Sequence, residues 1–245
     1  TGVIKMKYMG SKNRHSKQIL PLILKDRKPE QWYVEPFVGG ANMIDKVDGL
    51  RIGNDCNKYL IALLKEMQDF KFKSPSVTEK EFNMMKIKPE DFDDWILGYA
   101  GFQLSFGAMW FGSYRRDNTG KRNYSEEAKR NVDKQAKKVK GIHFYNSEYY
   151  DFFIPENSII YCDPPYKGTA KYKANEDEFN HDVFYGWARI KAKEGHQVFI
   201  SEYSMPDDFI CIWQKKVNGN ISKDTGKKKS VEKLFVHESQ IKQEL

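Results

Sequence analysis

Short apolar runs alternate with amphipathic segments along most of this 245-residue chain, and this alternation restricts the fold more than any other feature. The runs at 31–35 and 50–54 each predict a strand, and each is followed by a turn and a segment with helical spacing of its apolar residues. A βαβα series predicts a parallel sheet with helices on both faces. We therefore expect an α/β, Rossmann-like core, with further strands at 142–146, 158–162, 196–203, 209–217 and 233–237, and helices at 12–24, 41–47, 56–70, 125–140 and 181–193.

The alternation breaks between residues 71 and 140, which indicates an insertion. Residues 74–106 carry helical candidates, and residues 107–124 are rich in aromatic residues, Gly and Arg. We predict one catalytic domain made of residues 1–70 and 141–245, with an inserted helical and β-hairpin module at 71–140. Polar segments at 167–178 and 218–230 predict surface loops.

The net charge of +7 is concentrated in two stretches. Residues 111–145 hold ten Lys and Arg against four Asp and Glu, and residues 214–233 hold seven Lys against two acids. Such clustering is typical of a surface that binds a nucleic acid. A solvated, lysine-rich helix and tail is the alternative.

Other classes of protein are disfavoured by composition. The three Cys, which form no CxxC pair, argue against a disulfide framework and a cysteine-rich zinc site, and they suit a reducing cytosol. The five His show no ligand spacing, so we predict no metal. No apolar run is long enough for export or for a membrane span, and no obligatory protein partner is evident.

Asp163-Pro164-Pro165-Tyr166 directly follows the predicted strand at 158–162, at the edge where open α/β sheets bind ligands. An exocyclic amine of adenine is a poor nucleophile until acceptors draw its two protons, and the Asp163 carboxylate and the Pro164 carbonyl are two such acceptors. Tyr166 is suited to stack on an extruded base. The alternative is a strand that ends in a proline turn, with Asp163 as a helix cap and Tyr166 in the core.

A glycine turn, Glu35-Pro36-Phe37-Val38-Gly39-Gly40, follows the first predicted strand, and Asn54-Asp55 closes the second. Glycines allow close approach of a cofactor, and an acid at the end of the second strand can bind ribose hydroxyls. The GxGxxG spacing of dinucleotide sites is missing. Together the two motifs predict a nucleoside cofactor, whereas either alone is as well explained by an ordinary turn and a solvent-facing acid.

In their order, these motifs resemble the Dam-type, D12 class of N6-adenine DNA methyltransferases over nearly the full length of the chain. The N-terminal segment KYMGSK, residues 7–12, resembles that family's cofactor segment. The resemblance implies S-adenosylmethionine as cofactor and assigns its binding to Tyr8, Lys12, Glu35, Pro36, Phe37, Gly39, Gly40, Asp55, Glu148, Tyr149 and Asp163.

The segment at 111–123 resembles the family's recognition hairpin, and Asn118-Thr119-Gly120 predicts its tip. An Arg on a hairpin can read guanine with two hydrogen bonds, while its neighbours neutralise phosphates. An aromatic residue can fill the space that an extruded base leaves. The DNA-contacting residues so predicted are Trp110, Phe111, Arg115, Arg116, Lys121 and Arg122, with a solvated charged hairpin and core aromatics as the alternative.

The sequence thus predicts an enzyme that transfers methyl from S-adenosylmethionine to N6 of a flipped adenine in double-stranded DNA. Two alternatives stay open at this point. One is an RNA or protein amide methyltransferase, because a DPPY-like loop can orient other planar nitrogens. The other is a non-catalytic DNA-binding protein on a methyltransferase scaffold.

Overall fold

The computed structural model describes residues 6–117, 119–167, 179–218 and 229–241. Most of the predicted polar loops, residues 168–178 and 219–228, therefore lie outside the described part, as does Asn118 at the predicted hairpin tip. No helix in the described ranges is long and apolar enough to cross a membrane.

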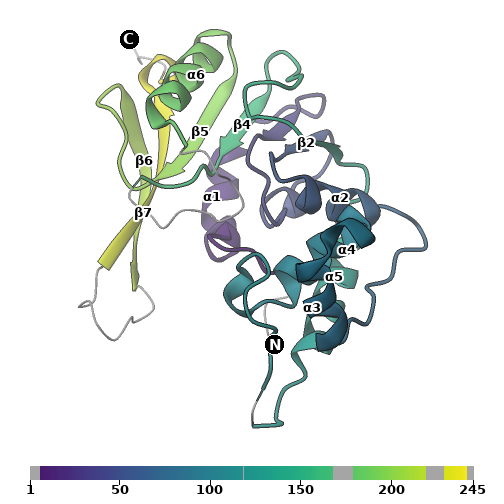
Figure 1. Ribbon diagram of the computed structural model, residues 1–245. Coiled ribbons are helices and arrows are strands. Elements are labelled where there is room, and N and C mark those ends of the chain that lie inside the picture. Colours follow the sequence, from purple (N-terminus) through teal and green to yellow (C-terminus); the bar gives the residue numbers. More distant parts are fainter. Residues whose placement is uncertain (1–5, 118, 168–178, 219–228, 242–245) are drawn as a thin grey trace.

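A seven-stranded sheet in the order β3-β2-β1-β4-β5-β7-β6 forms the centre of the protein (Figure 1). All seven strands lie where the sequence predicts them. The first five run parallel, and β7 pairs antiparallel with both β5 and β6. Their bounds are β1 Tyr33–Glu35, β2 Arg51–Asn54, β3 His143–Tyr145, β4 Ile159–Cys162, β5 Gln197–Glu202, β6 Phe209–Asn218 and β7 Lys229–His237.

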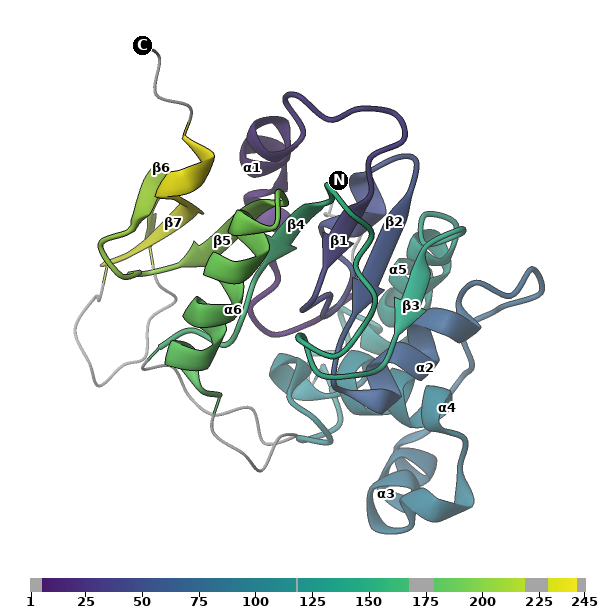
Figure 2. The same cartoon turned by 90° about the horizontal axis from the view of Figure 1, so that it is seen from above.

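Side chains that alternate along each strand build a separate apolar layer on each face of the sheet. Val34 and Ile160 pack with residues of α6 (His181–Lys193). Tyr33 and Ile159 face the other side, where α1 (Ser16–Ile23) and α2 (Lys58–Glu66) cover the sheet. Figure 2 shows α6 and α2 on opposite sides of the strands. The predicted α/β core with helices on both faces is confirmed.

Asparagine caps define where three of the helices begin. Asn57, Asn123 and Asn180 each accept a hydrogen bond from a backbone N–H in the first turn of α2, α5 (Tyr124–Ala136) and α6, respectively. The predicted helix at 41–47 is wrong, because only a single 3-10 turn forms there, at Ile44–Lys46. The tight glycine turn before it, with Ala41 in the left-handed region, prevents a longer helix.

The segment predicted to be an insertion, residues 71–140, is helical and shares the core of the sheet. It contains α3 (Glu79–Ile87), α4 (Asp94–Gly98), a π-helical turn at Tyr99–Gln103 and α5.

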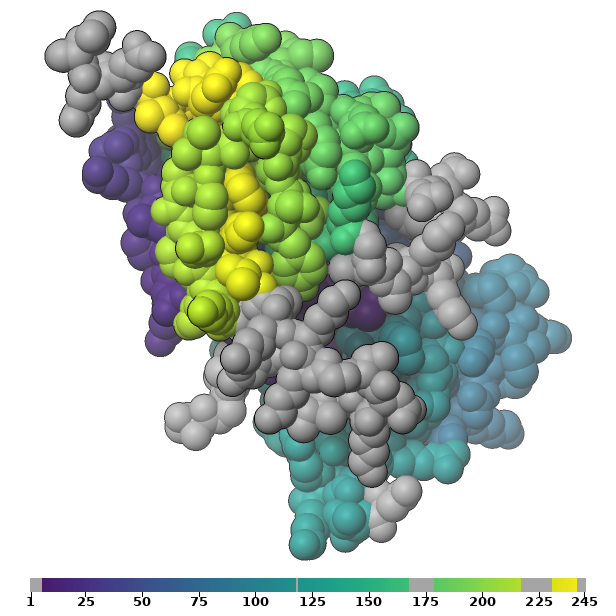
Figure 3. Space-filling model, turned by 90° about the vertical axis from the view of Figure 1, so that its left-hand side faces the viewer, coloured from purple at the N-terminus to yellow at the C-terminus, as the bar shows by residue number. Residues whose placement is uncertain are grey.

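Short 3-10 turns flank the principal elements at Lys12–Arg14, Pro89–Asp91, Phe106–Ala108 and Glu238–Gln240. Figure 3 shows the insertion, in teal, and the β6–β7 pair, in yellow-green and yellow, at opposite ends of one face of the molecule.

The predicted β-hairpin is not formed by paired strands in the described residues of the insertion. A single bridge joins Ser105 to Tyr114, and beyond it the loop is held by Asp117. The Asp117 carboxylate accepts hydrogen bonds from the backbone N–H groups of Thr119 and Arg122. The Asp117 side chain therefore accepts backbone hydrogen bonds that a paired strand would otherwise accept. Asp side chains commonly compete with regular secondary structure in this way.

Candidate active site

The strand order reverses between β1 and β4, and the carboxyl ends of these two strands open onto the main pocket of the protein. Such a switch point is where open α/β sheets bind their ligands. The pocket encloses about 730 Å³, within the range of roughly 300–1,000 Å³ that small-molecule sites occupy. Its lining joins the N-terminal segment, the glycine turn, Asp55 and the DPPY motif. The structure therefore brings together motifs that are up to 158 residues apart, from Tyr8 to Tyr166.

The glycine turn is shaped to receive Tyr8. Gly39 has a φ of +48°, and a Cβ added there would lie 2.8 Å from the Tyr8 ring. Asp55 fastens the turn, since its Oδ2 accepts a hydrogen bond of 3.0 Å from the Gly39 N–H. Its other oxygen accepts from the Asn57 N–H, also over 3.0 Å. Asp55 thus shapes the cofactor-side wall of the pocket as well as lining it.

Two carboxyl groups in this wall are hard to ionise. Burial raises the pKa of Asp55 to about 6, against the hydrogen bonds from Asn57 and Gly39. Burial also raises the pKa of Glu35 well above its ordinary value, although the Tyr33 hydroxyl donates to its Oε1 over 2.8 Å. Both side chains line the pocket.

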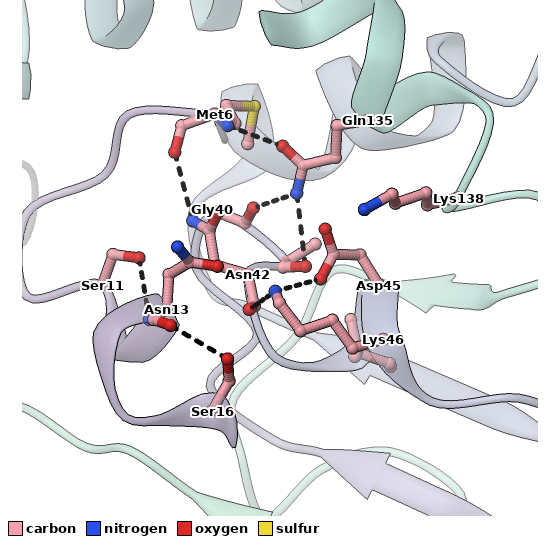
Figure 4. A network of polar contacts seen from close by, with 12 residues as sticks. Met6, Ser11, Asn13, Ser16, Gly40, Asn42, Asp45, Lys46, Gln135 and Lys138 are labelled. Atoms are coloured by element: carbon pink, nitrogen blue, oxygen red, sulfur yellow. Dashed lines mark hydrogen bonds and ion pairs between the residues drawn. The ribbon is translucent and has the colours of Figure 1, made fainter. Parts of the chain in front are cut away.

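Helix α5 of the insertion holds the glycine turn through Gln135, as Figure 4 shows. The Gln135 amide donates to the carbonyls of Gly40, at 2.9 Å, and Ala41, at 3.3 Å. Its oxygen accepts from the Met6 N–H at 2.8 Å. Asn42 Nδ2 donates to the Met6 carbonyl at 3.2 Å. The N-terminal segment, the glycine turn and the insertion therefore form one hydrogen-bonded unit.

The buried Lys12 and the partly buried Asp163 form an ion pair on the opposite wall. Lys12 Nζ lies 3.1 Å from Asp163 Oδ1 and 3.6 Å from Glu232 Oε2. Burial alone would lower the pKa of Lys12, but the charges of Asp163 and Glu232 outweigh burial and raise it. The pKa of Asp163 is also raised, because burial and the Glu232 charge together exceed the effect of Lys12. Lys12 is thus charged at neutral pH, and it partly offsets the cost of an ionised Asp163.

Tyr166 completes this wall, with its ring and its hydroxyl in different environments. Its hydroxyl donates to Glu232 Oε2 over 3.0 Å, and the ammonium of Lys12 lies 4.3 Å from the centre of its ring. The ring of Tyr203 meets it edge-on, at 4.6 Å between centroids. Pro164 and Pro165 also line the pocket. Tyr166 is therefore fixed on several sides, as a stacking surface requires.

Polar atoms in the pocket wall fit a nucleoside-type ligand. Within the described residues, Asn42 Oδ1 and His15 Nδ1 are buried and have no hydrogen-bond partner, and both residues line the pocket. An unsatisfied buried acceptor costs about 1–3 kcal/mol, which a polar ligand can recover. Together with the buried carboxyl groups, these atoms suit the hydroxyl and amino groups of S-adenosylmethionine. In the same described ranges, no three His, Cys, Asp or Glu side chains gather as metal ligands.

Most of the residues predicted to bind cofactor lie in the pocket wall, but three do not. Pro36 is buried behind it, and its carbonyl accepts from Asn54 Nδ2. Tyr149 packs into the α6 layer, 5.2 Å from the ring of Phe37. Glu148 is exposed beside it and acts on the site through its charge, which raises the pKa of Asp55. These three residues do not line the pocket, and their contact with the cofactor stays a prediction.

The predicted DNA-contacting residues divide into three groups. Trp110 lines the pocket, whereas Phe111 is buried against Phe82 and is therefore unsuited to contact DNA. The Arg115 guanidinium lies 4.2 Å from the centre of the Tyr124 ring, with a buried N–H that lacks a partner in the described residues. The other basic residues lie around the same loop: Arg116 paired with Glu79, Arg122 paired with Glu127, and Lys121 exposed.

Several residues of the pocket were not predicted. Glu232 lies in a lysine-rich tail segment, and His15 and Asn42 belong to no motif. Glu202, beside the pocket, accepts hydrogen bonds from the N–H groups of Lys167 and Tyr203 and so anchors the end of the DPPY turn. No sequence motif marks these side chains as site residues, because strand pairing between distant segments brings them to the pocket.

A parallel sheet of this order, with an antiparallel β7 and a pocket at its switch point, is the Rossmann-like fold of methyltransferases. Residues 8–95 match the model of the D12 class N6 adenine-specific DNA methyltransferase family. The match confirms the predicted resemblance to this family.

Comparison with other proteins gives distant matches. No curated protein sequence matches the chain. Among solved structures, 30 chains match. One of them is SMU.472 complexed with SAH, a protein whose methyltransferase activity is itself inferred, at 13% identity and a TM-score of 0.37. The alignment covers 92% of this chain and 52% of that one, so the chain spans about half the length of SMU.472.

Proposed function

We propose that the protein transfers a methyl group from S-adenosylmethionine to N6 of an adenine that has been extruded from double-stranded DNA. The observation that carries this proposal is one continuous pocket joining the glycine turn and Asp55 to Asp163 and Tyr166. A cofactor on the first side and a base on the second are thereby held face to face. The family match to an adenine-specific class supports the same reaction.

In this proposal, the residues near the base hold it in position and accept the hydrogen bonds of its amine. Asp163 and the Pro164 carbonyl accept hydrogen bonds from the two amine protons, which aligns the nitrogen lone pair with the methyl carbon. Tyr166 stacks on the base, a contact of about 1–3 kcal/mol. When bound, S-adenosylmethionine supplies a methyl group made electrophilic by its sulfonium. Because N6 lies on the pairing edge of adenine, the base must leave the duplex to reach this wall.

The insertion at 71–140 supplies the contacts to DNA in this proposal, and residues 1–70 and 141–245 the chemistry. Arg115 is the best base-reading candidate, because the Tyr124 ring fixes its guanidinium while one N–H stays unsatisfied. Arg116, Lys121 and Arg122 are suited to phosphates, since a duplex can compete for groups that are now solvated or in exposed ion pairs. Trp110, at the pocket wall, fills the space left by the base.

The decisive experiment incubates unmethylated duplex DNA with methyl-labelled S-adenosylmethionine, followed by nucleoside digestion and mass spectrometry. We expect the label in N6-methyladenine, mapped to a defined site. Asp163→Asn keeps the shape of the side chain but removes its charge, and it should lower turnover at least a hundredfold or so while DNA binding persists. Asp151→Asn, at an exposed position outside the pocket, is the matched control.

Three results would change the proposal. Label in RNA or in protein amides, but not in duplex DNA, would indicate the alternative methyltransferase classes. DNA binding without saturable S-adenosylmethionine binding would indicate a non-catalytic protein. Normal turnover by Asp163→Asn would remove Asp163 from the reaction.

A further inference from the structure

Glu232 is a member of the pocket wall that the methyltransferase motifs do not explain. It lies on β7, two residues before the strand enters the core at Leu234. Its Oε2 accepts from the Tyr166 hydroxyl at 3.0 Å and lies 3.6 Å from Lys12 Nζ. One carboxylate oxygen thus contacts both the stacking residue and the cation that is paired with Asp163.

The ion pair with Lys12 occupies one oxygen of the carboxylate that is proposed to receive the amine. Asp163 Oδ1 is engaged by Lys12 over 3.1 Å, and an incoming amine needs acceptor capacity on the same carboxylate. Lys12 is 7% exposed, so water cannot readily replace Asp163 as its partner. Apart from the two carboxylates, its ammonium has a long hydrogen bond of 3.5 Å to the Gly10 carbonyl and lies 4.3 Å from the centre of the Tyr166 ring. A buried ammonium that loses its partner is strongly destabilised.

We infer that Glu232 is a positioning residue that takes over Lys12 when the amine binds to Asp163, and that holds Tyr166 in place for stacking. This inference rests on the proposed function. A modest movement of the Lys12 ammonium, from its present 3.1 Å contact toward the carboxylate 3.6 Å away, keeps the cation paired throughout. Asp163 is then free to accept a proton of the amine, and the Tyr166 ring does not move.

The inference predicts a shift in pH dependence that a purely structural residue does not cause. The charge of Glu232 helps to raise the pKa of Asp163. Removing that charge lowers the pKa of Asp163, so the range in which Asp163 is ionised extends to lower pH. In Glu232→Gln, Lys12 also stays locked to Asp163, because a neutral amide is a poorer partner for the ammonium.

The test compares the wild type, Glu232→Gln and Glu238→Gln, a control that removes an exposed Glu just beyond the end of β7. We expect Glu232→Gln to lower kcat about tenfold or more, with the acid limb of its pH–rate profile moved to lower pH. Affinity for S-adenosylhomocysteine, measured by calorimetry, should stay within about twofold and shows that the variant is folded. Glu238→Gln should match the wild type.

A second variant isolates the contact to Tyr166. Tyr166→Phe keeps the ring but removes the hydroxyl that donates to Glu232, and its effect should not add fully to that of Glu232→Gln. With 2-aminopurine at the mapped target position, both variants should show a smaller fluorescence change on binding, which reports base placement without turnover. The inference fails if the wild type methylates DNA and Glu232→Gln does the same with an unmoved acid limb. A wild type that methylates no DNA would instead reject the proposed function.

Discussion

Gln135 Nε2 donates a 2.9 Å hydrogen bond to the carbonyl of Gly40, so a helix of the insertion directly holds the glycine turn of the cofactor wall. The same side chain accepts from the Met6 N–H, which brings the N-terminal segment into the arrangement. The proposed DNA-binding segment and the proposed cofactor site are therefore connected by hydrogen bonds through the buried Gln135 amide.

Replacing Gln135 should weaken both the fold and the cofactor site. Gln135→Ala leaves the Met6 N–H and the Gly40 carbonyl without their buried partner, and each unsatisfied group costs about 1–3 kcal/mol. Urea titration should show a free energy of unfolding lower by about 2–4 kcal/mol. Gln18→Ala, on the exposed side of α1, is the control and should change it by less than about 0.5 kcal/mol. Equal stability of the two variants would contradict the role of Gln135.

A methyl group at Gly39 should remove cofactor binding. The added Cβ would lie 2.8 Å from the Tyr8 ring, and the φ of +48° costs a residue with a side chain about 1–2 kcal/mol. We expect Gly39→Ala to displace Tyr8 and to lower S-adenosylhomocysteine affinity at least tenfold in calorimetry. Gly186→Ala, in α6, meets no atom within 4 Å and should bind as the wild type does. Unchanged affinity in Gly39→Ala would show that Tyr8 does not shape the site.

The stability of the protein should fall as pH rises through the range in which Glu202 ionises. Burial raises the pKa of Glu202 to about 7, from an ordinary value of 4.5. The folded state therefore binds more protons than the unfolded chain between these values, and each pKa unit is worth about 1.4 kcal/mol. In Glu202→Gln, the stability lost between pH 5 and pH 8 should shrink by about 2 kcal/mol. Denaturation of the wild type, Glu202→Gln and Glu238→Gln at pH 5 and pH 8 measures this difference in stability. An identical pH dependence in all three proteins would contradict the prediction.

Arg115 and Arg116 should affect DNA in different ways. Arg115 is held over Tyr124, so Arg115→Ala should reduce discrimination against single-base changes in the target by about 1–3 kcal/mol. Arg116 is exposed and paired with Glu79, so Arg116→Ala should lower affinity slightly and equally for all sequences. Methylation of a randomised duplex library, followed by sequencing of modified sites, separates the two outcomes. A uniform loss in Arg115→Ala would mean that Arg115 contacts phosphate.

Local chemistry allowed much of this protein to be predicted from its residues. The seven strands and the helix at His181–Lys193 follow from apolar spacing, because a strand has a period of 2 and a helix of 3.6. The glycine turn, Asp55 and the DPPY tetrapeptide follow their strands directly, and parallel strands place their carboxyl ends at one edge. The residues next to each other in the sequence and the spacing of apolar residues were sufficient to predict these features.

Tertiary structure alone decided which side chains meet. Phe111 and Tyr149 are aromatic residues that suit a binding site or a core equally well, and packing put both in the core. Glu232 reached Lys12 because β7, more than 200 residues from Lys12 in the sequence, inserts between β5 and β6, a pairing that no local pattern specifies. The physical reason is that burial and ion pairing depend on non-local distances, whereas periodicity and turn chemistry are properties of a few consecutive residues.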